Sequence, residues 1–338
     1  MKTAIVILNW NGRKMLERFL PSVTTCCSEG DEVIIADNGS NDDSLEWLKK
    51  TYPSLRIIAL DKNYGFAEGY NKALLQIEAD YYVLLNDDVE VTPNWTTPIV
   101  TMLDADKQAA IAQPKLLMYT QRDTFEYAGG AGGYIDKCGY PFCRGRLFST
   151  LEHDKGQYDD VCELFWASGA AMFVKATAWK QLGGLDGDFF AHMEEIDFCW
   201  LAKNAGYKVL YCPQSVVYHV GGGTLPKSSP RKTYLNFRNN MALLYKNLPP
   251  ARRKRVLLLR LLLDGVAALK FLWEGHPKEL AAVYRAHRDF RRWKPALRNK
   301  SVHINPHEVS CVYQGRLLVD YYLRNKKTFS ELQDRFSK

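Results

Sequence analysis

The chain has 338 residues, of which 46% are hydrophobic and 25% charged, and this composition excludes a disordered or fibrous protein. Its length fits one large domain, with or without an appendage. The charge is uneven. Residues 1–226 hold 20 Lys and Arg against 30 Asp and Glu, whereas residues 227–338 hold 25 against 8, so the net charges are −10 and +17. The basic part predicts an anionic partner, either a membrane or a nucleic acid, unless it is only a solubilising helical tail.

The start of the chain predicts a strand rather than a secretory signal, because the apolar run Ala4–Leu8 is too short for a signal-peptide core. The eight cysteines show no metal-ligand spacing. Without a secretory signal we expect them to be reduced thiols in the cytoplasm.

Strands and helices alternate over the first 88 residues. Buried strands are predicted within residues 3–12, 31–40, 55–60 and 81–88, and helices within residues 13–23, 41–52 and 63–77. This alternation is typical of βαβ units and predicts an α/β fold with a parallel sheet.

Polar clusters follow three of these strands, at Asn9-Trp10-Asn11, Asp37-Asn38-Gly39-Ser40 and Asn86-Asp87-Asp88. The carboxyl ends of parallel strands share one edge, where such sheets bind ligands, so we expect the clusters to converge. Phosphate-binding glycine loops are absent from the sequence, and a bound nucleotide would therefore need a metal ion. The adjacent carboxylates that end the fourth strand suit Mg²⁺ or Mn²⁺. The alternative is a solvated turn.

Beyond the fourth strand the pattern is less regular. Residues 110–165 are rich in glycine and aromatic residues, and they predict loops and short strands. Residues 163–190 predict a strand, a helix start and a turn at Gly183-Gly184. An acidic helix start follows, with the helix running to Gly206 and then two strands, the second of which ends at His219.

Seven stretches in this order resemble the inverting family 2 glycosyltransferases, especially the bacterial rhamnosyl- and galactofuranosyltransferases. They are IVILNWNG, VIIADNGSNDDS, NYGFAEGYNKAL, VLLNDDVEV, WASGAAMFVKATAWKQLGGLDGDFF, EEIDFCWLAKNAGY and VVYHVGGGT. The resemblance implies a GT-A fold, a mostly parallel sheet flanked by helices, over residues 1–240. Residues 1–110 would bind the nucleotide sugar and residues 111–240 the acceptor, and residues 241–338 would form a helical basic extension.

The resemblance also assigns the donor site. Asn86-Asp87-Asp88 occupies the position of the family's Asp-x-Asp metal motif, with Asn86 in place of the first acid. Asp88 is expected to hold the metal, and His219 to complete the site. Trp10 could stack on a uracil or thymine ring, or pack as a core aromatic. The residues expected to bind the nucleotide sugar are Asn9, Trp10, Asn11, Asp37, Asn38, Asn63, Gly65, Asn71 and Asp87.

The catalytic base is expected at the acidic helix start. An inverting transfer needs one carboxylate to take the proton of the attacking hydroxyl. Glu195 falls at the family's base position, where an Asp is usual, and Glu194 and Asp197 are the alternatives. Acids in a first helical turn also have a structural explanation, the helix dipole. Three further residues are expected to contact the acceptor or a phosphate: Trp166, Asp186 and Arg238.

Residues 256–275 are apolar over the length of a membrane span, but they include Arg260, Asp264, Lys270 and Glu274. On a helix these four charges fall within an arc of about 120°. Such sorting is typical of an amphipathic helix rather than a spanning one. Since it follows the basic run 251–255, we expect it to lie on an anionic membrane surface. The alternatives are packing on the catalytic part or on a second copy in a homodimer.

The sequence thus predicts a metal-dependent inverting glycosyltransferase, peripheral on the inner face of the cell membrane. It would move a sugar from a UDP- or dTDP-sugar to a hydroxyl of a lipid-linked acceptor in surface polysaccharide biosynthesis. One alternative is a nucleotidyltransferase, which would want a glycine-rich, basic first loop. The other is a nucleic-acid-binding protein that uses the basic tail, although that tail has no recognition motif.

Overall fold

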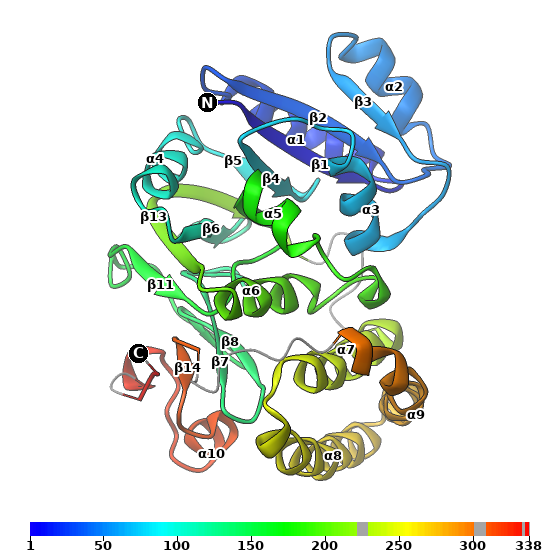
Figure 1. Ribbon diagram of the computed structural model, residues 1–338, viewed down its shortest axis with the longest axis vertical. Coiled ribbons are helices and arrows are strands. Elements are labelled where there is room, and N and C mark those ends of the chain that lie inside the picture. The colour runs from blue at the N-terminus through cyan, green and yellow to red at the C-terminus, as the bar shows by residue number, and fades with distance from the viewer. Residues whose placement is uncertain (222–228, 301–308, 333–334, 338) are drawn as a thin grey trace.

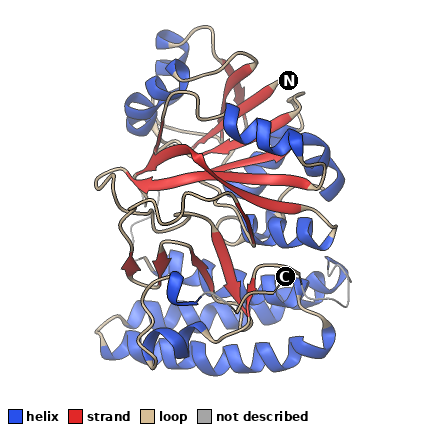
Figure 2. Cartoon of the chain, turned by 90° about the vertical axis from the view of Figure 1, so that its left-hand side faces the viewer, coloured by secondary structure: helices blue, strands red, loops and turns tan. Residues whose placement is uncertain are grey.

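The structure is a computed structural model that describes residues 1–338 apart from 222–228, 301–308, 333–334 and 338 (Figure 1). Its centre is a nine-stranded mixed sheet with the order β11-β13-β6-β12-β4-β1-β2-β3, and β5 pairs with β13. A second, five-stranded sheet has the order β10-β9-β8-β7-β14. Helices flank the large sheet, and a layer of helices forms the other end of the molecule (Figure 2).

The first half contains the predicted βαβ units. Its strands are β1 (Thr3–Asn9), β2 (Asp31–Asp37), β3 (Arg56–Ala59), β4 (Tyr81–Leu85) and β5 (Val89–Val91), and its helices are α1 (Arg13–Thr25), α2 (Ser44–Thr51), α3 (Gly65–Leu74) and α4 (Thr97–Ala105). Strands β3, β2, β1 and β4 pair in parallel. Side chains on both faces of β1 and β4 are buried, as expected for apolar strands covered by helices on both sides.

The second half extends the sheet with antiparallel neighbours. It contributes β6 (Ala109–Met118), β11 (Cys162–Leu164), β12 (Ala171–Lys175) and β13 (Lys208–His219). Strand β12 runs antiparallel to β4 and β6, whereas β13 runs parallel to β6.

Two predictions for this half were wrong. The stretch 109–118, which we expected to be loop or short strand, is a ten-residue strand that is almost wholly buried. Pro114 lies within it, beside a register shift between Cys212 and Val216, and such irregularities are where a strand tolerates proline. The same irregularity explains why residues 208–219 form one bulged strand instead of two.

The small sheet joins the C-terminal part to the middle of the chain. Its strands are β7 (Gly133–Asp136), β8 (Pro141–Cys143), β9 (Arg146–Leu147), β10 (Thr150–Leu151) and β14 (Val312–Tyr313). Strand β14 pairs in parallel with β7, and aromatic side chains from both regions pack together, among them Phe142 and Tyr313. The basic part is therefore built into the molecule rather than attached as a free tail.

The remaining helices include the one with the acidic start and those of the basic part. They are α5 (Ala176–Leu182), α6 (Glu194–Asn204), α7 (Pro230–Asn247), α8 (Pro250–Trp273), α9 (Pro277–Lys300), α10 (Leu317–Tyr322) and the 3₁₀ helices η1 (Gly187–Phe189) and η2 (Ser330–Leu332). Helix α7 contacts α6, α8 and α9, and the expected domain boundary at residue 240 lies inside it. None of the helices in the described part of the chain is long and apolar enough to cross a membrane. All eight cysteines are free thiols.

Candidate active site

The polar clusters that end β1 and β2 lie together, as predicted. The side-chain amide of Asn9 donates to Asp37 Oδ1 at 2.8 Å and to the hydroxyls of Ser40 and Ser44 at 3.0 Å each. Asp37 Oδ2 in turn accepts from the backbone N–H of Ser40 at 3.0 Å. Asp37 is only 1% exposed, so its carboxylate fixes the loop after β2. A ligand at this edge would contact the loop that Asp37 holds.

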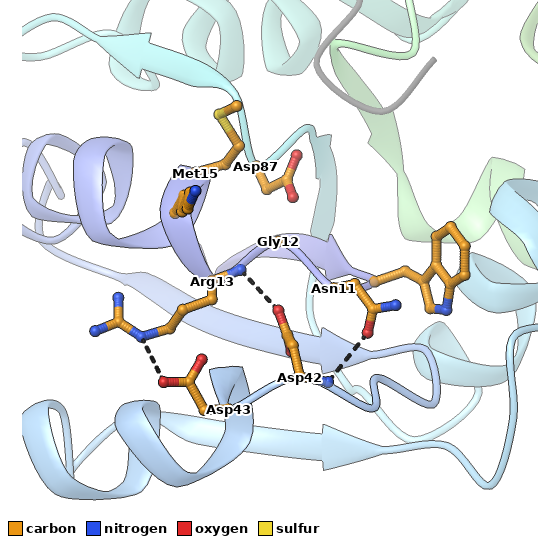
Figure 3. A pocket seen from close by; sticks show the side chains of 9 residues that line it. Asn11, Gly12, Arg13, Met15, Asp42, Asp43 and Asp87 are labelled. Atoms are coloured by element: carbon orange, nitrogen blue, oxygen red, sulfur yellow. Dashed lines mark hydrogen bonds and ion pairs between the residues drawn. The ribbon is translucent and has the colours of Figure 1, made fainter.

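A cavity of about 430 Å³ opens beside these strand ends, a size typical of small-molecule sites. The residues that line it are Trp10, Asn11, Gly12, Arg13, Lys14, Met15, Asp42, Asp43 and Asp87. The Trp10 side chain is 41% exposed and is therefore not a core aromatic. Asp87 points toward the turn after β1 (Figure 3). A Cβ on Gly12 would lie 2.2 Å from Asp87 Oδ2, so a larger residue at this position would displace the Asp87 carboxylate.

Three asparagines that were predicted to bind the nucleotide sugar make hydrogen bonds between loops of the protein. Asn38 donates to the carbonyl of Gly65 at 2.9 Å, and Asn63 accepts from the N–H of Gly65 at 2.7 Å. Asn71 pairs with both backbone groups of Leu185, donating at 2.7 Å and accepting at 3.0 Å. These bonds join the end of β2, the start of α3 and the turn that precedes α6. Their geometry therefore sets how the two halves of the site face each other.

The strand-end acids meet a histidine from the far end of the sheet. Asp88 and His219 are both buried, and Asp88 Oδ1 lies 3.0 Å from His219 Nε2. On the other side of the ring, Nδ1 lies 3.3 Å from Glu126 Oε1. Burial opposes protonation, but Asp88 and Glu126 outweigh it and raise the pKa of His219 to about 10. Burial, followed by repulsion from Asp88, raises the pKa of Asp87 to about 7.

Glu126 was missed by the sequence analysis. It is 3% exposed, and its other oxygen, Oε2, accepts from the N–H of Ala128 at 2.6 Å, which fixes the carboxylate toward His219. A carboxylate behind a histidine holds the ring orientation and its basicity. Nothing local marks Glu126 in the sequence, because it lies between β6 and β7 in the stretch for which only loops and short strands were predicted. The glycines that follow the histidine, Gly222 and Gly223, lie outside the described residues.

The first turn of α6 carries the candidate bases. Glu194 is buried and Glu195 is partly exposed. Burial raises the pKa of Glu195 to about 7. It also raises the pKa of Glu194 well above its ordinary value, with Glu195 adding to the shift. Within the described part of the chain, the Oε2 atoms of both residues are buried without a hydrogen-bond partner. A buried polar atom without a partner lowers the stability of a fold, and such atoms are found preferentially at functional sites.

Asp197, the third candidate, has a different environment. Its Oδ2 lies 2.6 Å from Lys246 Nζ and its Oδ1 accepts from Asn247 at 2.7 Å. Lys246 also bonds Asp186 at 2.7 Å. Although burial opposes ionisation of Asp186, Lys246 and Lys300 lower its pKa. Asp186 and Asp197 therefore join α6 and its preceding turn to the basic helices, and this leaves Glu194 and Glu195 as the carboxylates with unpaired oxygens.

The loop that leads into α6 is strained. Three of its non-glycine residues adopt positive φ, namely Phe190 (67°), His192 (70°) and Met193 (74°). The buried amide of Asn239 holds this backbone, lying 2.8–3.0 Å from three carbonyl oxygens, those of Phe189, Ala191 and His192. Such strain persists only where surrounding contacts over-determine it, and it concentrates at active sites.

Arg238 and Trp166, the remaining residues expected to contact acceptor or phosphate, lie in two separate parts of the structure. Arg238 donates to the carbonyls of Asp188 and Phe189 at 3.1 and 3.0 Å and stacks on Trp293, so it supports the same loop as Asn239. Trp166 is buried, and its indole N–H donates to Tyr134 O at 2.9 Å. A direct contact of either residue with acceptor or phosphate stays a prediction.

Comparison with known proteins supports the family resemblance. Residues 4–130 match the model of glycosyl transferase family 2. An N-acetylglucosaminyl-diphospho-decaprenol L-rhamnosyltransferase of Mycobacterium tuberculosis is 25% identical over 233 residues, which cover 64% of this chain and 75% of that protein. The matches support a family 2 glycosyltransferase.

Solved structures confirm the fold of the chain. GalNAc-T7 with UDP, GalNAc and Mn²⁺ superposes with a TM-score of 0.57 at 17% identity, over 73% of this chain and 48% of that one. The chain thus spans about half the length of GalNAc-T7. The S. aureus TarS fragment 1–349 with UDP-GlcNAc gives a TM-score of 0.57 at 15% identity, over 89% of this chain and 84% of that one. The expected α/β, GT-A-like fold with a helical C-terminal part is confirmed.

Proposed function

We propose that this glycosyltransferase moves a sugar from a UDP- or dTDP-sugar to a hydroxyl of a lipid-linked acceptor, with inversion at the anomeric carbon. One observation carries the proposal. The acidic end of β4 faces a cavity with an exposed tryptophan on one side, and helix α6 begins with two glutamates, each of which has one buried oxygen without a hydrogen-bond partner among the described residues. A sugar nucleotide offers the complementary groups, an aromatic base and a diphosphate that binds a divalent cation.

The nucleotide would bind in the cavity at the ends of β1 and β2. Trp10 is available for stacking on the base, since its indole is 41% exposed. Asn9, Asp37 and Asn38 support this contact by holding the neighbouring loops. Asn63, Gly65 and Asn71 have the same role on the sugar side, through the turn before α6. The UDP of the two solved neighbours supports a uridine nucleotide as the first donor to test.

A divalent cation, Mg²⁺ or Mn²⁺, would be held by Asp88 and His219. Their ligand atoms lie 3.0 Å apart, which is about the spacing of adjacent ligands around a six-coordinate ion with bonds of about 2.1 Å. The raised pKa of His219 also indicates that Asp88 and Glu126 stabilise positive charge here. No third His, Cys, Asp or Glu among the described residues completes a metal cluster, so the donor diphosphate and water would supply the other ligands. When bound, the ion would neutralise charge on the diphosphate leaving group.

Glu195 would act as the base. Glu195 is more exposed than Glu194, and its pKa of about 7 suits proton transfer near neutral pH. The hydroxyl oxygen attacks the anomeric carbon as its proton passes to a Glu195 carboxylate oxygen, and the nucleoside diphosphate leaves from the opposite face. This single displacement inverts the anomeric configuration. Glu194, more deeply buried beside it, raises the cost of ionising the pair.

The relatives and the charge distribution support the proposed acceptor and location. The mycobacterial relative is named for a diphospho-decaprenol acceptor, which supports a lipid-linked glycan in surface polysaccharide biosynthesis. Such an acceptor lies at a membrane, and the basic residues 227–338 would favour the anionic inner face of the cell membrane.

A donor panel tests the proposal. Purified protein is incubated with UDP- and dTDP-sugars and a lipid-linked acceptor, with Mg²⁺, Mn²⁺ or EDTA, and release of nucleoside diphosphate is measured. We expect acceptor- and metal-dependent release from one donor. Absence of release from every donor, together with salt-sensitive DNA binding, would instead favour a nucleic-acid-binding protein.

A further inference from the structure

Helix α8 is oriented with its charged pair toward the protein. Arg260 and Asp264 are 4% and 1% exposed. Arg260 donates to the carbonyl of Gly139 at 3.0 Å and stacks on Tyr140, and Asp264 Oδ2 lies 3.0 Å from His287 Nε2 on α9. Buried charges are retained only with such partners. The pair therefore attaches α8 to the loop after β7 and to α9.

The opposite face of α8 is apolar and exposed. Its large side chains at the surface are Leu258, Leu261, Leu262, Val266, Leu269, Leu272 and Trp273. At 3.6 residues per turn most of them fall within an arc of about 120° centred opposite Arg260 and Asp264. The indole of Trp273 is 89% exposed. A contiguous apolar strip of this kind on a surface helix marks an interaction site.

Basic residues lie beside the same strip. Lys254 and Arg255 are exposed, and helical spacing puts Arg255 within the apolar arc and Lys254 about 20° outside its edge, about one turn before Leu258. Leucines and a tryptophan beside lysine and arginine are the composition of helices that lie in a membrane interface. A second copy of the chain fits less well, because pairing would bring together two regions that each carry a net charge of +17. Charge complementarity therefore favours an anionic lipid surface as the occupant.

The position of α8 relates this surface to the catalytic helix. Helix α7 lies between α8 and α6 (Figure 1), and it holds α6 through the contacts of Lys246 and Asn247 with Asp197. Helices α8 and α7 would thus lie between the membrane and the acidic start of α6. This arrangement would present Glu195 to an acceptor anchored in the same membrane.

We propose that the outer face of α8, formed by Leu258–Trp273 together with Lys254 and Arg255, docks in the interface of an anionic membrane. The helix lies parallel to the surface, with Arg260 and Asp264 keeping it on the protein. The inference deepens the proposed function, on which its account of the acceptor rests, while the docking itself needs neither donor nor acceptor. Activity and docking can therefore fail separately.

Vesicle binding of the full chain tests the proposal. The probes are vesicles of phosphatidylcholine alone and of phosphatidylcholine with phosphatidylglycerol, assayed by cosedimentation and by tryptophan fluorescence without donor or acceptor. We expect binding to the anionic vesicles, weakened by salt, with a blue shift that Trp273→Phe removes. Leu262→Glu with Leu269→Glu should abolish binding, and Lys254→Ser with Arg255→Ser should weaken it about fivefold per residue.

The matched control is Leu75→Glu, because Leu75 is 86% exposed and follows α3 in the nucleotide-binding half. It should bind like the wild type, and circular dichroism should show every variant folded, since all the substituted side chains point to solvent. Binding that survives Leu262→Glu with Leu269→Glu would overturn the assignment. So would a lack of vesicle binding with a concentration-dependent dimer that these substitutions dissociate, because the strip would then be a contact between copies. In either case the donor panel still reports on transfer.

Discussion

The substitution Glu195→Gln tests the base directly. Removing a general base costs about 10²–10⁴-fold in rate. The structure adds an expected pH dependence, because burial raises the pKa of Glu195 to about 7 and only the carboxylate can accept the proton. The wild-type rate should therefore increase about tenfold between one pH unit below that pKa and one unit above it, and then level off. The amide that replaces the carboxyl group in Glu195→Gln cannot titrate, so this variant should lose both the rate and the increase.

The assay compares initial rates of nucleoside diphosphate release in the presence of acceptor, over pH, for Glu195→Gln and the matched variant Glu194→Gln. Calorimetry of nucleotide binding serves as the control. It should be nearly unchanged, because the proposed nucleotide contacts lie at the ends of β1, β2 and β4. If Glu194→Gln is inactive while Glu195→Gln keeps both its rate and its pH profile, the base is Glu194. If both remain active, the assignment of the base to Glu195 or Glu194 is refuted, and Asp197 is the remaining candidate.

Three further substitutions probe the surrounding structure. Asp88→Asn should abolish metal-dependent UDP or dTDP binding in a folded protein, and unchanged calorimetric affinity would contradict this. Lys246→Met leaves the buried carboxylates of Asp186 and Asp197 without their shared cation and should cost about 3–5 kcal/mol in denaturant unfolding, whereas Lys180→Met, at an exposed site on α5, should cost little. Asn239→Ala frees the strained loop before α6 and should lower kcat about 10²-fold with donor affinity kept; equal losses in kcat and donor affinity would argue against a positioning role.

The strand ends could be predicted from the sequence because their signal is local. An apolar run that stops at paired acids, as at Asp87-Asp88, indicates both a buried strand and the edge at which it ends. The helix start at Glu194-Glu195 is equally local. Parallel pairing then brings such ends together without further information. The α/β fold with a parallel sheet followed from the same pattern, whereas the GT-A-like fold was implied by the family resemblance.

What the sequence could not predict depends on contacts between distant segments. Glu126 gains its place beside His219 only when β6 and β13 pair. In the sequence, Asp197 is as good a candidate for the catalytic base as Glu194 and Glu195. In the structure it bonds Lys246 of α7, which the sequence alone does not indicate. The charges of α8 were correctly sorted onto one side of the helix, but Arg260 and Asp264 face the protein rather than water, because partners on another loop and another helix neutralise them. The periodicity of a sequence therefore predicts which residues share a helix face, but not whether that face contacts protein, water or membrane.

The most direct test of the account is the product itself. After incubation with the donor chosen by the panel, the acceptor should gain the mass of one sugar, and proton NMR should show an anomeric configuration opposite to that of the donor. Both results should be lost in Glu195→Gln. A product with retained configuration would contradict the single displacement with one carboxylate base, and a failure to find any glycosylated acceptor with active, metal-loaded protein would contradict the proposed transfer.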